Sequence, residues 1–167
     1  MVVLDSEIGE AFEFDTICLK RHSSGSTSAG TNYDDFQIWV GLTDTDALSP
    51  VFEDNFLPGT RTLLFSRDSL YLEAEPNAWI PFELDTPYWY GGSHNLIIEV
   101  LWSGGEEIGS ECVYTWQWNT GTMRCASGPF SSSSGSLTSV IPLLQLVGEA
   151  SLDSATFAEV KAEFSGE

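Results

Sequence analysis

The chain has 167 residues, of which 25 are Asp or Glu and 6 are Lys or Arg, so its formal net charge is −19. This length fits one domain, and the 42% hydrophobic content can bury enough apolar surface to offset the entropy lost on folding. Such an acidic chain repels polyphosphate, so we expect no nucleic-acid partner. The longest apolar run, residues 96–102, is interrupted by Glu99 and is shorter than the roughly 18 residues that span a bilayer, so we expect no membrane insertion.

Apolar and polar residues alternate in short runs, which are separated by Gly, Pro, Ser, Asn and Asp. This pattern predicts strands with no helix between them. The expected strands are residues 12–21, 35–42, 61–66, 69–73, 78–84, 95–102, 112–118, 123–127 and 139–147. About nine short strands at this spacing favour an all-β fold, an antiparallel sandwich or a barrel. We expect one β domain over residues 1–147 and a C-terminal tail over residues 148–167.

The tail carries two periodicities. Ala158, Val160, Ala162 and Phe164 alternate with charged residues, as in a half-buried strand, whereas Phe157, Val160 and Phe164 also share one helical face. The tail is therefore expected to be either an extra strand or a short helix. As a strand, it would pair with its own sheet edge or with a second copy, and Phe157, Val160 and Phe164 would set the register.

Four segments follow one another in an order typical of one kind of module: residues 36–43, 52–56, 79–87 and 90–102. Over residues 7–147 the chain resembles the jelly-roll-like β-sandwich modules of secreted and cell-surface bacterial proteins, which include adhesin-type and carbohydrate-binding modules. The resemblance implies a jelly-roll-like sandwich of about nine strands and an extracellular or cell-surface location.

Catalytic residues are few. His22 and His94 are the two histidines of the chain, and both fall in predicted loops, so a Ser-His-Asp relay would need two loops to meet. With 25 carboxylates, almost any pair fits the requirement of a glycosidase, so such a pair is not specific evidence. We expect no enzymatic activity.

Acidic residues at predicted loops make calcium a candidate cofactor, because calcium is bound by six to eight oxygen ligands from carboxylates and loop carbonyls. None of them follows the spacing of a helix-loop-helix calcium site, and a solvated acidic surface explains the same residues. The candidate ligands are Asp34, Asp35, Asp44, Asp46 and Asp54.

The three cysteines, Cys18, Cys112 and Cys125, allow at most one disulfide. A hairpin centred on residues 120–121 would place Cys125 opposite Trp116 and about 13 Å from Cys112, which is too far for a bridge without a bulge. The pairing stays open, with buried free thiols as the alternative.

Two aromatic clusters are candidate sugar-binding platforms. Residues i and i+2 of a strand share a face and stand about 7 Å apart, a spacing at which aromatic rings can stack on sugar rings. Burial in the core of a sandwich is the alternative for both clusters. The first cluster is Tyr114, Trp116 and Trp118, and the second is Tyr88, Trp89 and Tyr90.

These observations favour a non-catalytic, extracellular structural or adhesive module that associates with itself or with other surface proteins. In the most specific form of this hypothesis, the tail adds as a strand to the next subunit and builds a filament or sheath. The alternative is a carbohydrate-binding module that holds glycans on its aromatic platforms.

Overall fold

The computed structural model describes residues 1–23, 30–105 and 115–150, which fold into an all-β, antiparallel, sandwich-like structure. The first elements are β1 (Val2–Val3), α1 (Asp5–Ile8), β2 (Phe12–Lys20), β3 (Thr31–Thr43), the 3₁₀-helix η1 (Glu53–Asn55), β4 (Thr62–Leu72) and β5 (Trp79–Tyr90). The later elements are β6 (Asn95–Leu101), β7 (Gly104–Gly105), β8 (Gln117–Asn119), β9 (Cys125–Ser127), β10 (Ser136–Thr138), β11 (Val140–Pro142) and β12 (Leu144–Ala150).

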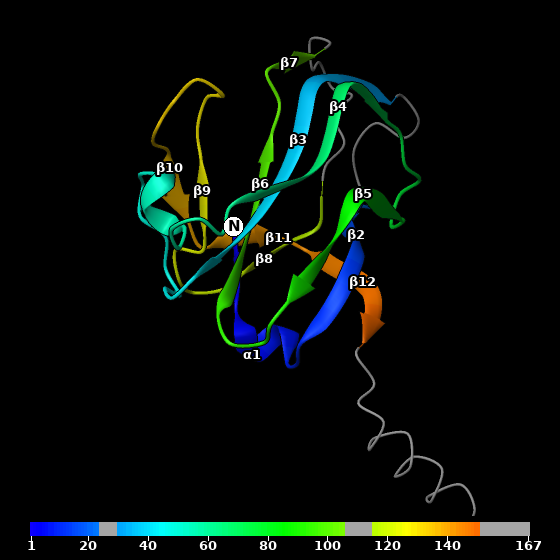
Figure 1. The fold of residues 1–167 in the computed structure, drawn as a ribbon. Coiled ribbons are helices and arrows are strands. Elements are labelled where there is room, and N and C mark those ends of the chain that lie inside the picture. The colour runs from blue at the N-terminus through cyan, green and yellow to red at the C-terminus, as the bar shows by residue number, and fades with distance from the viewer. Residues whose placement is uncertain (24–29, 106–114, 151–167) are drawn as a thin grey trace, which may run out of the picture.

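Two antiparallel sheets form the sandwich (Figure 1). The first has the strand order β1-β6-β3-β4, with β7 added to β3, and the second has the order β12-β2-β5. Apolar residues that alternate along the strands fill the space between the sheets, as the period of a half-buried strand requires. The buried core residues are Phe14, Ile17, Phe36, Ile38, Val40, Leu64, Phe65, Ile80, Phe82, Tyr90, Leu96 and Ile98.

Aromatic rings join the two sheets at the centre of this core. Phe36 of β3 stacks on Phe82 of β5, with ring centroids 5.5 Å apart and ring planes 6° from parallel. Phe65 of β4 meets both rings edge-on, at 6.0 Å from Phe36 and 5.7 Å from Phe82. Stacked and edge-on pairs of this kind add to the stabilisation that burial alone supplies.

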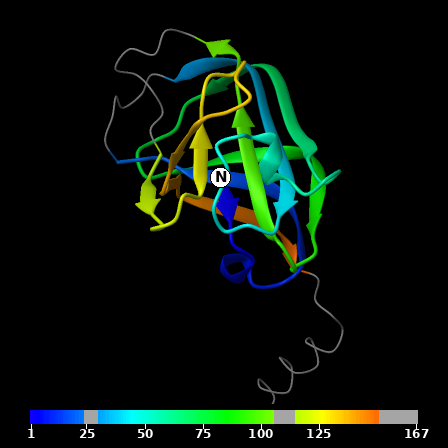
Figure 2. The ribbon, with the colours of Figure 1, turned by 90° about the vertical axis from the view of Figure 1, so that its left-hand side faces the viewer.

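A second, smaller core lies on the outer face of the first sheet. Val2 and Ile97 point away from the main core and pack with Leu48, and the hairpin of β9 and β10 covers them through Ala126 and Leu137 (Figure 2). The first sheet is therefore buried on both faces at its β1 end.

The fold differs from the sequence prediction in several places. Residues 61–66 and 69–73 belong to one long strand, β4, and residues 139–147 are divided at Leu143 between β11 and β12. Helix α1 interrupts the strands, although no helix was expected there. The described chain has twelve strands, because several pairings involve only two or three residues.

The hairpin that was considered around residues 120–121 does not form. Strand β8 pairs with β11, and β9 pairs with β10, so the two arms of that turn do not pair with each other. The Thr120 amide and hydroxyl both donate to the Ser139 carbonyl oxygen, at 2.9 Å each, which ties the turn to the returning chain instead.

Strand β12 continues past the expected end of the domain at residue 147. After a register shift between Val147 and Gly148, the residues Gly148, Glu149 and Ala150 pair with β2 as far as Phe12. These three residues are therefore part of the second sheet and not of the tail.

Candidate functional site

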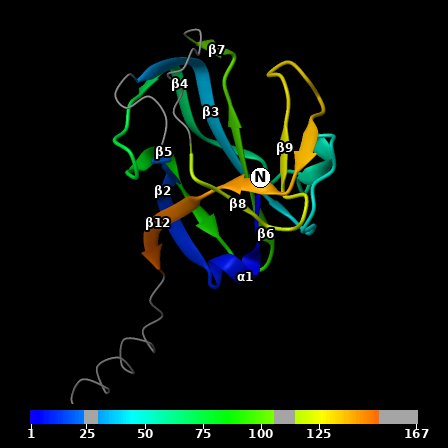
Figure 3. The same ribbon diagram turned by 180° about the vertical axis from the view of Figure 1, so that it is seen from behind.

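An apolar groove of about 510 Å³ opens on the side of the sandwich where β12 forms the edge of its sheet. Figure 3 shows β12, β8 and α1 on this side of the molecule. The groove is lined by Val3, Glu7, Ile8, Phe12, Trp118, Ile141, Pro142, Leu143, Leu144 and Leu146. A second depression of about 420 Å³ shares Ile8, Phe12 and Leu146 with it and extends along β12 to Gly148. The two depressions together follow most of the edge strand.

Strands β1 and β12 are edge strands of the two sheets, and only the edge of β1 is covered by another segment of the described chain. The Val2 amide of β1 donates to the Arg124 carbonyl oxygen at 2.8 Å, so the chain before β9 covers that edge. Strand β12 has β2 on one side, and on its other side no strand of the described chain pairs with it. An edge strand beside an apolar groove is the arrangement that accepts an added strand.

Arg124 fixes one wall of the groove. Its side chain is 3% exposed and donates from Nε and Nη2 to the Val2 carbonyl oxygen, at 3.1 and 2.9 Å. The same guanidinium forms two hydrogen bonds with the Glu7 carboxylate, one of them at 2.8 Å between Nη1 and Oε1. These hydrogen bonds hold the pKa of Glu7 below its usual range, against a smaller opposing effect of burial. The ion pair thereby anchors α1, which carries Ile8 into the groove.

A second surface feature is a row of three side chains on the outer face of the other sheet. Lys20 of β2 pairs with Trp79 of β5, and the Trp116 amide donates to the Lys20 carbonyl oxygen at 2.8 Å from the other side. The bridge between Arg21 and Thr115 sets this register, so Trp116, Lys20 and Trp79 are neighbours across three chain segments. The Lys20 ammonium lies over the Trp79 ring, 4.9 Å from its centroid. We call these three residues the lysine–tryptophan row.

Polar groups surround the Trp116 indole. Its Nε1 donates to Asn77 Oδ1 at 3.1 Å, and its ring lies 4.2 Å from that of His22, centroid to centroid. Asn77 has a positive φ of 65° in the turn before β5, a conformation that asparagine tolerates better than most residues. Both tryptophans of the row remain partly open, with 38% of Trp79 and 36% of Trp116 exposed.

The predicted aromatic platforms are only partly formed. Trp116 and Trp118 are both exposed, but Trp116 belongs to the row and Trp118 lines the groove, while Tyr114 lies outside the described residues. In the second cluster, Trp89 is exposed, whereas Tyr90 is 1% exposed and donates from its hydroxyl to the His94 carbonyl oxygen.

Tyr90 therefore cannot contribute to a surface platform, because it packs in the main core. Tyr88 is half-buried against the same core, and burial raises the pKa of its phenol. The alternation of a strand explains the outcome, since neighbouring residues face opposite sides of the sheet and cannot form one face.

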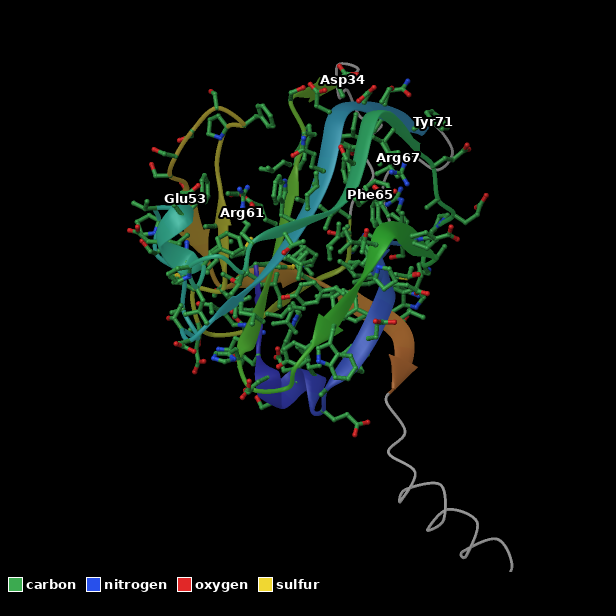
Figure 4. The ribbon with its side chains drawn as sticks, in the orientation of Figure 1. Asp34, Glu53, Arg61, Phe65, Arg67 and Tyr71 are labelled. Atoms are coloured by element: carbon green, nitrogen blue, oxygen red, sulfur yellow. The ribbon has the colours of Figure 1, made fainter. Side chains whose placement is uncertain are left out.

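The candidate calcium ligands lie in separate places. Asp34 and Asp35 are near one end of β3 and Asp44 and Asp46 follow its other end, while Asp54 lies in η1; Figure 4 shows Asp34 far from Glu53 of that turn. In the part of the chain that the structure describes, no three His, Cys, Asp or Glu side chains gather as a metal site.

Several of these polar residues bind protein groups instead. The Asp35 carboxylate accepts from the Ser103 hydroxyl at 2.5 Å, and the Asp46 carboxylate accepts from Asn95 Nδ2 at 2.8 Å. Asn55, next to Asp54, is buried, and its side-chain amide bonds to the backbone of Ser49 in both directions. Calcium binding stays a prediction, for which residues 1–23, 30–105 and 115–150 show no cluster of ligands.

His94 makes two polar side-chain contacts, with Ser93 and Asp44. Its Nδ1 lies 3.0 Å from the Ser93 hydroxyl oxygen, and its Nε2 lies 3.5 Å from Asp44 Oδ1. Ser93 is the adjacent residue in the chain, and the Asp44 side chain is largely exposed, so water competes for every contact. An activated nucleophile needs a shielded base that a third group orients, and this surface turn does not supply one.

Cys18 and Cys125 are free thiols, and Cys112 lies outside the described residues. Cys18 pairs with Pro81 and Gln145 on the face that carries the lysine–tryptophan row, and burial raises the pKa of its thiol. The predicted assembly residues Phe157, Val160 and Phe164 also lie outside the described residues.

Sequence reasoning did not single out Lys20, Trp79, Ile8 or Phe12 as site residues. The row depends on the register of three segments that are far apart in the chain, and the groove depends on α1, which has only four residues. A signal for the row was present in the sequence, because Lys20 is one of only six basic residues in the whole chain.

Comparison of the chain with protein-family models, with curated proteins and with solved structures finds no match. No helix among residues 1–23, 30–105 and 115–150 is long and apolar enough to cross a membrane. The antiparallel sandwich-like fold is therefore the level at which this chain is classified.

Proposed function

We propose that this protein is a non-catalytic structural or adhesive module of the cell surface or extracellular space, and that it associates with copies of itself by strand addition at β12. The observation that carries this proposal is the combination of an edge strand and an apolar groove along the same side of the sandwich. An added strand would gain main-chain hydrogen bonds from β12 and would bury apolar side chains in the groove.

The proposed occupant is the segment that follows β12, residues 151–167, of a second copy. Ala158, Val160, Ala162 and Phe164 alternate with charged residues over this segment, which is the pattern of a strand with one apolar face. The groove presents Ile8, Leu144 and Leu146 to such a face. Repetition of the same head-to-tail contact would produce an open chain of subunits, such as a filament or sheath.

The native mass of the protein tests this proposal. The full chain is expected to form species larger than its 18.3 kDa monomer by light scattering, with a fraction that rises with concentration. A variant that ends at Ala150 keeps every described strand and is expected to remain a monomer with an unchanged circular dichroism spectrum. A full chain that stays monomeric, or a truncated chain that assembles equally well, would contradict the proposal.

A matched pair of tryptophan variants locates the contact. Trp118 lines the groove and is 48% exposed, so Trp118→Ser is expected to weaken assembly without disturbing the main core. Trp89 is 54% exposed on β5 and does not line the groove, so Trp89→Ser is expected to leave assembly unchanged. Equal effects of the two variants would place the contact elsewhere.

A further inference from the structure

The lysine–tryptophan row joins three side chains of different chemistry on one face. Trp116, Lys20 and Trp79 lie on neighbouring segments, so the backbones of the two outer residues are about 10 Å apart at the usual strand spacing. The row lies on the second sheet, and none of its residues lines the groove. It is therefore independent of the surface proposed for self-association.

The charge at the row is opposite to that of the molecule. Arg61, Arg67 and Arg124 each form an ion pair with a carboxylate, as expected for a chain with a net charge of −19. Lys20 forms no ion pair with any carboxylate of the described chain, and its ammonium lies over the Trp79 ring instead. A cation that is held over an aromatic ring can still attract an anion.

The neighbouring groups suit a sugar ring. Indole faces pack against the apolar C–H faces of sugars, and two partly exposed indoles flank the lysine. Asn77 accepts the Trp116 indole N–H with its Oδ1, which directs its Nδ2 donors to other acceptors, and no described residue accepts from them. The surface thus offers two partly exposed indoles, an amide donor and one positive charge.

We propose that the lysine–tryptophan row binds a glycan that contains a carboxylated sugar, of the hexuronic acid class. The indoles of Trp79 and Trp116 stack on sugar rings, and the Lys20 ammonium pairs with the sugar carboxylate. Specificity for the acidic sugar comes from Lys20, because the surrounding negative charge of the protein repels anions that do not reach this cation.

Titration of the full chain with uronate oligosaccharides tests the proposal. The panel consists of oligomers of galacturonate, of glucuronate-containing repeats and of guluronate or mannuronate, with the neutral hexose oligomer of matched length as the comparison. At least one uronate oligomer is expected to bind about tenfold more tightly than its neutral counterpart at low salt. Binding to none of the uronate oligomers, or equal binding of acidic and neutral oligomers, would overturn the proposal.

Single substitutions separate the contribution of the Lys20 charge from that of stacking on Trp79. Lys20→Gln is expected to remove the preference for the uronate while leaving weak binding of both oligomers, and Trp79→Ala is expected to abolish binding of both. Trp89→Ala removes a tryptophan of the same strand that is more exposed than Trp79, 54% against 38%, and is expected to change neither. The circular dichroism spectrum of each variant checks its fold, and a Lys20→Gln variant that keeps the full preference would show that the lysine does not carry it.

Discussion

Buried polar side chains hold the chain where regular strands do not. Arg124 joins the segment before β9 to Val2 and to Glu7 of α1, and Asn95 accepts from the Asp5 amide while donating to the Thr45 carbonyl oxygen. No buried side-chain nitrogen or oxygen of the described residues lacks a hydrogen-bond partner. Substitution of one of these residues is therefore expected to destabilise the β1 end, since an unpaired buried polar group is costly.

The first prediction concerns the charge pair at this end. Glu7→Gln leaves the guanidinium of Arg124, which is 3% exposed, without a countercharge. We expect the free energy of unfolding to fall by about 2–3 kcal/mol, below the usual cost for a fully buried pair because Glu7 is partly exposed. Urea denaturation measures this change, and Glu75→Gln at an exposed site serves as the control. A change of the same small size in both variants would contradict the assigned role of Glu7.

The same pair predicts a pH dependence. Because Arg124 lowers the pKa of Glu7 in the folded protein, the carboxylate contributes stability above its unfolded pKa of about 4.5. This contribution is lost as the pH falls through the lower folded pKa. The difference in unfolding free energy between the wild type and Glu7→Gln is therefore expected to be largest near neutral pH and to shrink below about pH 4. If this difference in unfolding free energy grew towards low pH, the ionised Glu7 carboxylate would not be the stabilising form.

At the scale of elements, long alternating runs predict strands well and short ones do not. Residues 12–21 and 95–102 were expected as strands and correspond to β2 and β6 within one residue at each end. Between residues 115 and 142, each strand has three residues, which is too short for a period-two signal, and tertiary pairing decides the partners. The turn at residues 120–121 does not form a hairpin, because β8 pairs with β11 and β9 pairs with β10.

The candidate sites, like the strand pairing, depend on contacts between distant parts of the chain. Trp116 and Trp118 were candidates either for a surface platform or for the core, and both are exposed, but their partners Asn77, Ile141 and Lys20 come from distant segments of the chain. A sequence can indicate which aromatic residues are candidates, whereas the register between distant strands determines which of them share a surface.

The second structural prediction concerns the end of β12. Gly148 follows a register shift, and a Cβ at this position would overlap the Glu13 carbonyl oxygen and the Phe14 Cα of β2. Gly148→Ala is therefore expected to lower the free energy of unfolding by about 1–3 kcal/mol, or to detach residues 148–150 from β2. Gly91→Ala, where a Cβ meets no atom within 4 Å, is the matched control. Equal denaturation midpoints for the two variants would contradict the tight contact at Gly148.

At the scale of the whole molecule, net charge opposes self-association. Each copy carries a charge of −19, so assembly brings two strongly negative bodies together, and apolar burial in the groove must outweigh their repulsion. Binding of an anionic glycan at Lys20 has the opposite electrostatic sign at short range. Salt therefore separates the two proposed activities.

Salt is expected to change self-association and the binding of uronate by Lys20 in opposite directions. Raising the ionic strength from about 0.05 M to about 0.5 M shortens the Debye length and screens both effects. We expect the assembled fraction of the full chain to rise over this range. The part of the uronate affinity that Lys20 supplies, measured as the difference between the wild type and Lys20→Gln, is expected to fall. Light scattering and calorimetric titration on the same samples measure the two trends. Assembly that weakens with salt would indicate a contact held by charges and not by the groove.

Binding of a peptide with the sequence that follows β12 is a direct test of strand addition at this edge. A peptide of residues 151–167 is added to the chain that ends at Ala150, and backbone amide resonances are followed by NMR. Strand addition predicts saturable binding that shifts the amides of β12 and those of Ile8 and Trp118 in the groove, and protects alternate β12 amides from exchange. No binding at concentrations at which the full chain assembles, or shifts confined to strands away from β12, would contradict it.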